Sequence, residues 1–214
     1  MAGFISFFIL SFATHAEVVE RFDADLKLNK NGSLDVVEKI LYDFEYRTDG
    51  HGIYRDLPVV YGPDGDEVQV SVNLLSVTDE NGVPYNYVNE GDGYYTAVKI
   101  GDADKYVSGK KWYYIHYVVE GVANGFEDHD EIYWNVTGND WKVSIENSSV
   151  SFVGPEGPVV SGSGAYNRAA CYTGYFGSSA TNCDADVAGP VVFNYKTNGI
   201  LLPGEGFTIV AGFE

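Results

Sequence analysis

Alternating apolar and polar residues near the start of the chain predict a β-hairpin. Between Val18 and Leu28 one face carries every even-numbered position: Val18, Glu20, Phe22, Ala24, Leu26 and Leu28. The odd-numbered positions are mostly charged, so the segment has the two-residue period of a half-buried strand. An Asn31-Gly32 turn follows, and alternation resumes from Leu34 to Phe44. Glu38 falls on the apolar face of this second strand, so either it has a partner there or the strand bulges.

Short apolar runs separated by Gly, Asn and Asp continue along the rest of the chain. We expect further strands at 68–75, 85–87, 94–100, 111–119, 131–136, 141–145, 149–153, 189–195 and 206–213. No window shows a sustained helical stripe, and 47–65 is expected to be a loop. The segment 154–189 is rich in small residues and is expected to be a long loop or a small β insert. The predicted fold is all-β, an antiparallel β-sandwich.

The first 16 residues predict a signal peptide. Phe4 to Phe12 is an apolar run too short to cross a bilayer as a helix, and the small residues Thr14 and Ala16 are suited to cleavage. A buried first strand or helix is the alternative. Residues 17–214 are then expected to form one domain outside the cytoplasm, with a second domain starting near residue 154 as the alternative.

The charge of the chain limits its partners. It has 31 Asp and Glu against 13 Lys and Arg, for a net charge of −18. Such a field repels nucleic-acid phosphates and anionic membrane surfaces, so neither is an expected direct ligand. It can attract cations and basic partners, but a solvated acidic coat is the favoured explanation.

Cys171 and Cys183 are the only cysteines. In an exported chain, two cysteines close in sequence and flanked by Gly, Ser and Thr indicate one disulfide that closes a short loop. A pair of free thiols is the alternative. Their spacing matches no zinc site.

Acidic clusters raise the hypothesis of a bound calcium ion. The densest cluster contains the candidate ligands Asp128, Asp130 and Glu131. Adjacent carboxylates repel one another unless a cation intervenes, and calcium prefers oxygen ligands. The cluster lacks the spacing of an EF-hand loop, so a solvated turn is the competing interpretation, and no other cofactor is expected.

No catalytic motif is present, so we expect no enzyme. Nucleophile-elbow, phosphate-loop, zinc-helix and dinucleotide patterns are all missing. A glycan hydrolase, with two carboxylates across a groove, is the less favoured alternative. Trp112, Trp134 and Trp141 would stack on sugar rings if they were exposed, although packing in the core is the expected role of each.

The most distinctive segment is His51-Gly-Ile-Tyr-Arg-Asp-Leu-Pro58. Its glycines permit backbone conformations closed to other residues, and Pro58 restricts the exit from the loop. Arg55 is expected to form a bidentate ion pair, for which Glu38 is a candidate partner. The alternative is that Arg55 binds an anionic ligand.

This segment resembles the signature of a family of predicted bacterial membrane proteins, defined by the domain of unknown function 2207. Other resembling segments are 31–38, 99–102, 130–141, 171–174 with Cys183, and 202–206. The block from Asp130 to Trp141, with Glu131, Trp134 and Asn135, is the most recognisable. Together with His51, Arg55, Asp56 and Pro58, these are motif residues of unknown role, either a fold signature or a binding surface.

The resemblance implies a signal peptide, an extracytoplasmic β domain and then membrane helices. We therefore expect contact with the membrane through a segment outside this chain, or secretion if no anchor follows. The expected function is an interaction or envelope-sensing domain with a protein or glycan partner outside the cell. The alternative is a carbohydrate or cell-wall binding module with a structural calcium.

Overall fold

The structure is a computed structural model. It describes residues 16–61, 68–91, 95–125, 127, 129–155, 168–189 and 191–213. The signal-peptide segment, apart from Ala16, lies outside these ranges. Within them the secondary structure is all strand and turn, as the alternation predicts, and no helix is long and apolar enough to cross a membrane.

One large sheet forms a full layer of the sandwich. Its strand order is β15 (Cys183–Gly189), β16 (Val192–Thr197), β13 (Ser148–Val153), β1 (Val18–Leu28), β2 (Leu34–Asp43), β9 (Lys110–Glu120) and β6 (Ser71–Thr78), and the short β12 (Ser144–Ile145) also pairs with β1. The predicted hairpin of β1 and β2 is confirmed and lies near the middle of this sheet.

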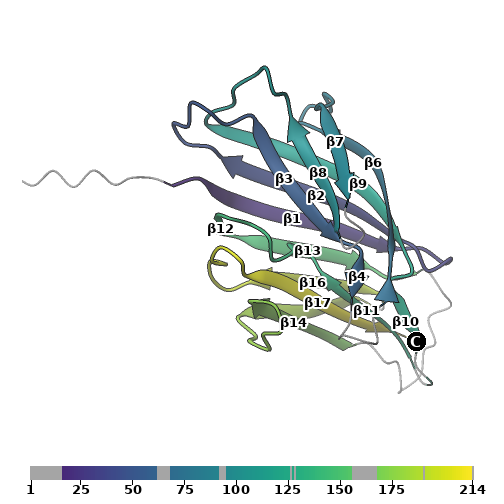
Figure 1. Cartoon of the computed structure of the whole chain (residues 1–214). Coiled ribbons are helices and arrows are strands. Elements are labelled where there is room, and N and C mark those ends of the chain that lie inside the picture. The colour runs from purple at the N-terminus through teal and green to yellow at the C-terminus, as the bar shows by residue number, and fades with distance from the viewer. Residues whose placement is uncertain are drawn as a thin grey trace, which may run out of the picture.

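Two smaller sheets pack on the large one. The first has the order β3 (Gly52–Pro58), β8 (Tyr95–Gly101) and β7 (Tyr87–Gly91). The second has the order β10 (Ala123–Gly125), β11 (Asp130–Asn135), β17 (Gly206–Phe213) and β14 (Arg168–Gly174). Figure 1 shows β3, β8 and β7 crossing in front of β2 and β9, with β11, β17 and β14 in the other half of the molecule. A ribbon of β4 (Val60–Tyr61) and β5 (Val68–Gln69) completes the strands.

The core lies between the layers because buried and more exposed residues alternate along the strands. In β2 every second residue from Leu34 is buried, and in β9 Tyr113, Ile115, Tyr117 and Val119 are at most 1% exposed. Burial of such side chains is worth about 1.5–3 kcal/mol each relative to exposure. Glu38 is also 0% exposed on this apolar face. A carboxylate buried in this way requires a partner, as its sequence position indicates.

Two details of the large sheet differ from the predicted pattern. The register between β1 and β2 shifts between Val19 and Arg21, and this bulge makes Val19 rather than Glu20 the buried residue at the start of β1. Furthermore, β1 pairs in parallel with β13, so the sheet is not wholly antiparallel. Alternation shows which face a residue takes but carries no information on the direction of a neighbouring strand.

Two predicted loops are partly strands. The expected loop at 47–65 contains β3, which carries the distinctive segment, and β4. Within 154–189, β14 joins one small sheet while β15 forms an edge of the large sheet, so these strands complete the sandwich rather than form a separate insert. Both regions are rich in Gly or polar residues, which hides their strand character. In the predicted strand at 141–145, only Ser144 and Ile145 pair.

The predicted disulfide between Cys171 and Cys183 is present, and the described residues include no free cysteine. Cys171 lies on β14 and Cys183 begins β15, so the bond joins an edge of one small sheet to an edge of the large sheet. The cross-link closes a short loop, and its effect in the chain-entropy account is a stabilisation of roughly 2–3 kcal/mol.

Replacing both cysteines, as in Cys171→Ser with Cys183→Ser, is expected to lower the free energy of unfolding by about 2–3 kcal/mol. Urea unfolding followed by tryptophan fluorescence measures this loss. The control is the unmodified chain treated with a reductant, which should lose the same amount. Equal stability of the double variant and the oxidised chain would contradict the structural role of the bond.

Candidate functional site

Arg55 and Glu38 form a buried, bidentate ion pair. Arg55 Nε donates to Glu38 Oε2 at 2.7 Å, and Nη2 donates to Oε1 at 2.7 Å. The side chains are only 2% and 0% exposed. This geometry confirms the pairing that the sequence predicts, and the anion-binding alternative for Arg55 loses its basis because the guanidinium is fully engaged.

The remaining donors of Arg55 bind backbone carbonyls. Nη1 donates to the carbonyl oxygens of Asp56 at 2.8 Å and Thr137 at 2.9 Å, and Nη2 donates to that of Val136 at 2.8 Å. With the two bonds to Glu38, all five N–H groups of the guanidinium have acceptors. A charge buried at this depth is tolerated only when its hydrogen bonds are complete.

The carboxylate has a second donor, and the guanidinium has an aromatic neighbour. Tyr117 Oη on β9 donates to Glu38 Oε1 at 2.6 Å. The Arg55 guanidinium carbon lies 5.3 Å from the centre of the Phe22 ring on β1, within cation–π range. Arg55 on β3 therefore links the large sheet to the turn that follows β11. One side chain connects all three main sheets.

The turn after β11 is shaped to present these carbonyls. Trp141 Nε1 donates to the Thr137 carbonyl at 2.9 Å, and Thr137 Oγ1 accepts a hydrogen bond from Phe207 N at 2.8 Å. Asn135 Nδ2 donates to Asn139 Oδ1 at 2.8 Å, which closes the turn from inside. Asn135 and Trp141 thus shape this turn, and the two motif blocks are parts of one cluster.

Glycine is required where this turn approaches Arg55. Gly138 has a φ of +74°, and a Cβ there would lie 3.1 Å from Arg55 Nη1. Both the left-handed backbone and the crowding exclude a larger residue without strain. Gly138 is therefore part of the surroundings that hold the Arg55 side chain.

His51 anchors the start of the same motif. Its Nδ1 lies 2.9 Å from the Lys105 carbonyl and 3.2 Å from that of Asp102, and its ring contacts Tyr106. Gly52 follows with a φ of +148°, and a Cβ there would overlap the Ile100 carbonyl at 1.8 Å. His51 and Gly52 hold β3 against β8, and Pro58 ends β3 opposite Tyr95.

An open cleft of about 380 Å³ lies on the outer side of this cluster. We call it the acidic cleft, and it is lined by Asp56, Glu90, Gly91, Tyr95, Ala97 and Asp140. Because successive strand residues face opposite sides, Arg55 points inward and Asp56 points outward. Asp56 and Asp140 come from the two motif blocks, so the buried pair positions part of the cleft.

The chemistry of the acidic cleft favours a cationic group. Ala97 pairs with Asp56 on one side and Glu90 on the other, so a small side chain lies between two carboxylates. The adjacent cross-strand row on the same face contains Lys99, whose ammonium lies over the Tyr54 ring. Its pKa is raised by a side-chain hydrogen bond with Tyr54 and, more weakly, by the charge of Glu90.

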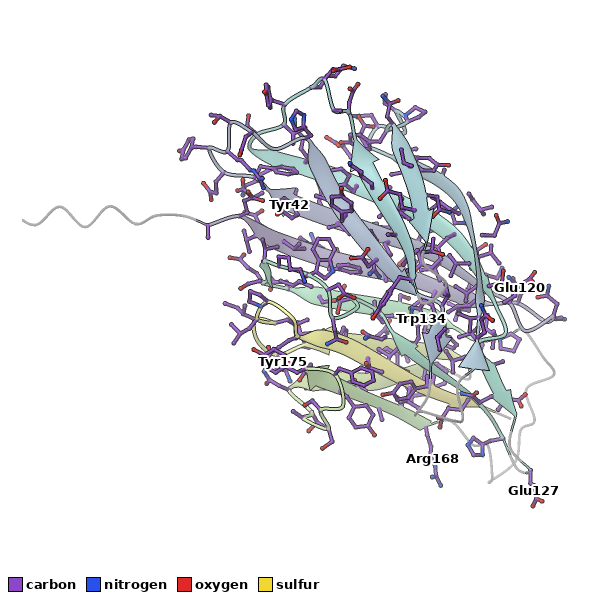
Figure 2. The ribbon with its side chains drawn as sticks, viewed as in Figure 1. Tyr42, Glu120, Glu127, Trp134, Arg168 and Tyr175 are labelled. Atoms are coloured by element: carbon purple, nitrogen blue, oxygen red, sulfur yellow. A yellow bond between two sulfur atoms is a disulfide. The ribbon has the colours of Figure 1, made fainter. Side chains whose placement is uncertain are left out.

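The tryptophans predicted as alternatives for sugar binding lie mainly inside. Trp134 is 1% exposed and Trp141 is 8% exposed, whereas Trp112 is half-buried against Tyr114. Figure 2 shows Trp134 within the molecule, between the layers. Packing in the core is confirmed for Trp134 and Trp141, which counts against a sugar-stacking surface built from them.

The two calcium candidates that the structure describes, Asp130 and Glu131, do not converge on one point. Asp128 lies outside the described residues, and Asp130 and Glu131 are consecutive on β11, so their side chains project to opposite faces. His129 Nε2 lies 4.0 Å from a Glu131 carboxylate oxygen. Across the described part of the chain, no group of three or more metal-ligating side chains is suitably placed. Calcium binding remains an untested hypothesis.

Sequence reasoning found Glu38 but missed the other groups of this cluster, which are Tyr117 and the carbonyls of Val136 and Thr137. Tyr117 gives no polar signal because it occupies an ordinary buried position of an aromatic strand. Glu90 and Asp140 carry no sequence signal of their own: strand register aligns Glu90 with Asp56 across Ala97, and the turn after β11 brings Asp140 to the same cleft. The one available signal was Gly138 in the second motif, since a glycine can mark a left-handed turn or a close approach of the backbone to another group.

Comparison with known sequences agrees with this architecture. Residues 18–212 match the profile of a family described as the N-terminal domain of predicted membrane proteins, DUF2207. The chain is 31% identical over 150 residues to the uncharacterized protein YciQ of Escherichia coli strain K12. That match covers 66% of this chain and 24% of YciQ, so the chain spans about a quarter of its relative.

Among solved structures, the sandwich is similar to part of leukotriene A4 hydrolase from Saccharomyces cerevisiae. Two structures of the native yeast enzyme give TM-scores of 0.53 and 0.56 at 8% identity. Each match covers 92% of this chain and 29% of the enzyme. At this identity the likeness shows a shared fold alone.

Arg55→Met is expected to lower the free energy of unfolding by about 3–5 kcal/mol, because it leaves the Glu38 carboxylate buried without its cation. Arg47→Met is the matched control. Arg47 pairs with Glu17 and Asp49 at the surface, where such pairs contribute less than about 1 kcal/mol. Urea unfolding measures both. Equal small losses in the two variants would refute the special role of Arg55.

Gly138→Ala tests the fit of the turn around Arg55. A non-glycine residue in the left-handed region costs roughly 1–2 kcal/mol, and the contact with Arg55 adds to that loss. Gly82→Ala is the control, since Gly82 has a similar φ of +78° and a Cβ added there would have no atom within 4 Å. Thermal melting should show the larger decrease for Gly138→Ala, whereas equal decreases would mean that the turn does not crowd Arg55.

Proposed function

Because this chain belongs to the DUF2207 family of predicted membrane proteins, we propose that it is an extracytoplasmic, non-enzymatic domain that binds partners in the cell envelope. The observation that carries this proposal is the disulfide between Cys171 and Cys183. Disulfides form and persist in oxidising compartments and are rare in the cytosol. The bond therefore supports a position outside the cytoplasm.

The surface supports a binding role. Several aromatic side chains are largely exposed: Tyr46, Tyr54, Tyr87, Tyr95, Tyr106, Tyr175 and Phe176. Tyrosine and phenylalanine are enriched in protein interfaces relative to the rest of a protein surface. The net charge of −18 selects against anionic partners, so the favoured partner is a protein with basic groups.

In this account the membrane is reached through another segment of the protein. The strongly acidic domain is repelled by anionic lipid headgroups, so it stands away from the bilayer rather than lying on it. A tethered domain of this kind meets other envelope proteins at high effective concentration. The absence of enzymatic activity stays a prediction.

An epitope inserted between Asn81 and Gly82 tests the location. This turn is exposed, and it lies far from the Arg55 cluster in the sequence. In cells that make the membrane-associated protein, antibody should reach the tag after the outer layers are opened and before the inner membrane is permeabilised. A matched protein tagged in the cytoplasm is the control. Labelling only after permeabilisation of the inner membrane would overturn the proposed location.

A further inference from the structure

β7 is an edge strand that remains available for pairing. It pairs with β8 on one side, and the described residues place no strand along its other side. All five of its residues are exposed, and its pairing with β8 is regular from Tyr87 to Gly91, without a bulge. Regular, exposed edges are templates for the addition of another strand.

The direction of the free backbone groups follows from the register. Gly101 N donates to Asn86 O at 2.8 Å, so these two residues form a hydrogen-bonded pair. Such pairs alternate with pairs whose backbone groups point away from the partner strand. The N–H and C=O groups of Tyr87, Asn89 and Gly91 therefore point to the open side of β7.

The other edges of the sandwich are less suited to an added strand. On β3, the second edge of the same small sheet, the Asp56 carbonyl already accepts a hydrogen bond from Arg55 Nη1, and Gly138 of the turn after β11 lies close to it. β6 has a register shift between Leu74 and Ser76, and its far end is bridged to Pro84. β10 has three residues. β14 and β15 are joined by the disulfide, and Thr173 of β14 is bridged to Ala180. Bulges, short strands and covering segments are the usual means of blocking an edge.

The side chains on the outer face of β7 indicate which side chains an added strand would need. Glu90 lies in one cross-strand row with Ala97 and Asp56 and lines the acidic cleft. Val88, which is 55% exposed, lies on the same face in the adjacent row with Lys99. A strand added to β7 would place alternate side chains next to Val88 and Glu90.

We propose that β7 binds an extended segment of a basic partner protein as an added strand, with an apolar residue beside Val88 and a Lys or Arg beside Glu90. This inference rests on the proposed binding function and gives it a surface. The cationic side chain reaches past Glu90 into the acidic cleft, where Asp56 and Asp140 add negative charge. Like charge disfavours pairing of β7 with a second copy of this chain, because each copy carries a net charge of −18.

Two synthetic peptides test the inference with the 214-residue chain. One is acetyl-Thr-Val-Thr-Arg-Thr-Val-Thr-amide, and the other has Glu in place of Arg. We expect the Arg peptide to bind at least about tenfold more tightly at low salt, with the preference reduced as salt is raised. Its binding should slow hydrogen exchange of the Tyr87 and Asn89 amides, which point to the open edge. Equal affinities, or protection elsewhere, would overturn the inference.

Variants at Asn89 separate strand addition from simple charge attraction. Asn89→Pro removes an outward N–H without removing a bond to β8, and proline is tolerated on edge strands at such positions. Asn89→Ser keeps the N–H and is the matched control. Binding of the Arg peptide should fall at least about tenfold in Asn89→Pro and stay unchanged in Asn89→Ser, with melting temperatures compared to confirm folding. Equal binding by both folded variants would contradict strand addition.

Glu90→Gln tests the contribution of charge. It should lower the affinity for the Arg peptide by about three- to tenfold and should not lower the affinity for the Glu peptide. Peptide binding to the purified chain does not depend on the cellular compartment. If the epitope lies outside the cytoplasm but the Arg peptide does not bind, the strand-addition inference fails and the proposed location stands. If the Arg peptide binds but the epitope lies in the cytoplasm, the proposed location fails and the strand-addition inference stands.

Discussion

The fold depends on a single buried ion pair. Glu38 occupies the centre of an otherwise apolar face of the large sheet, and Arg55 reaches it from a small sheet while also binding carbonyls in the turn of the other small sheet. Removing two charges from water is costly, so the arrangement is stable only because every guanidinium donor has an acceptor. The pair therefore dictates how the three sheets meet, and mispacked arrangements would leave a charge buried without a partner.

The same constraint connects the framework to the surface. In β3, Arg55 must face inward, so Asp56 faces outward, and the turn that supplies Thr137 also places Asp140 nearby. The acidic cleft is thus built on residues that adjoin the buried pair rather than on flexible loops. Carboxylates that the fold already holds near one another lose little entropy when a cationic group binds, which is the property that the proposed binding role requires.

Much of the framework was predictable from sequence because it depends on local patterns. The period of two in β1 and β2, the Asn31-Gly32 turn and the apolar position of Glu38 required one hairpin and one buried cation. Glu38 was a candidate partner of Arg55 because the chain is rich in acids and Glu38 interrupts an apolar face, and the disulfide was predicted from the two cysteines. The parallel pairing of β1 with β13 and the meeting of Asp56, Glu90 and Asp140 depend on long-range register, for which no single segment carries a signal. The strand β3 was not predicted because Gly52 and Pro58, at its two ends, have low strand propensity.

Native-state hydrogen exchange in Arg55→Met tests most directly whether one pair couples the sheets. The register places the Val98 amide in the bonding between β8 and β3, and the Trp134 amide in that between β11 and β17. If the pair holds both small sheets to the large one, protection of these two amides falls together, and by a similar free energy. Loss of protection at Val98 with no change at Trp134 would show that Arg55 stabilises only its own sheet, and would contradict the account.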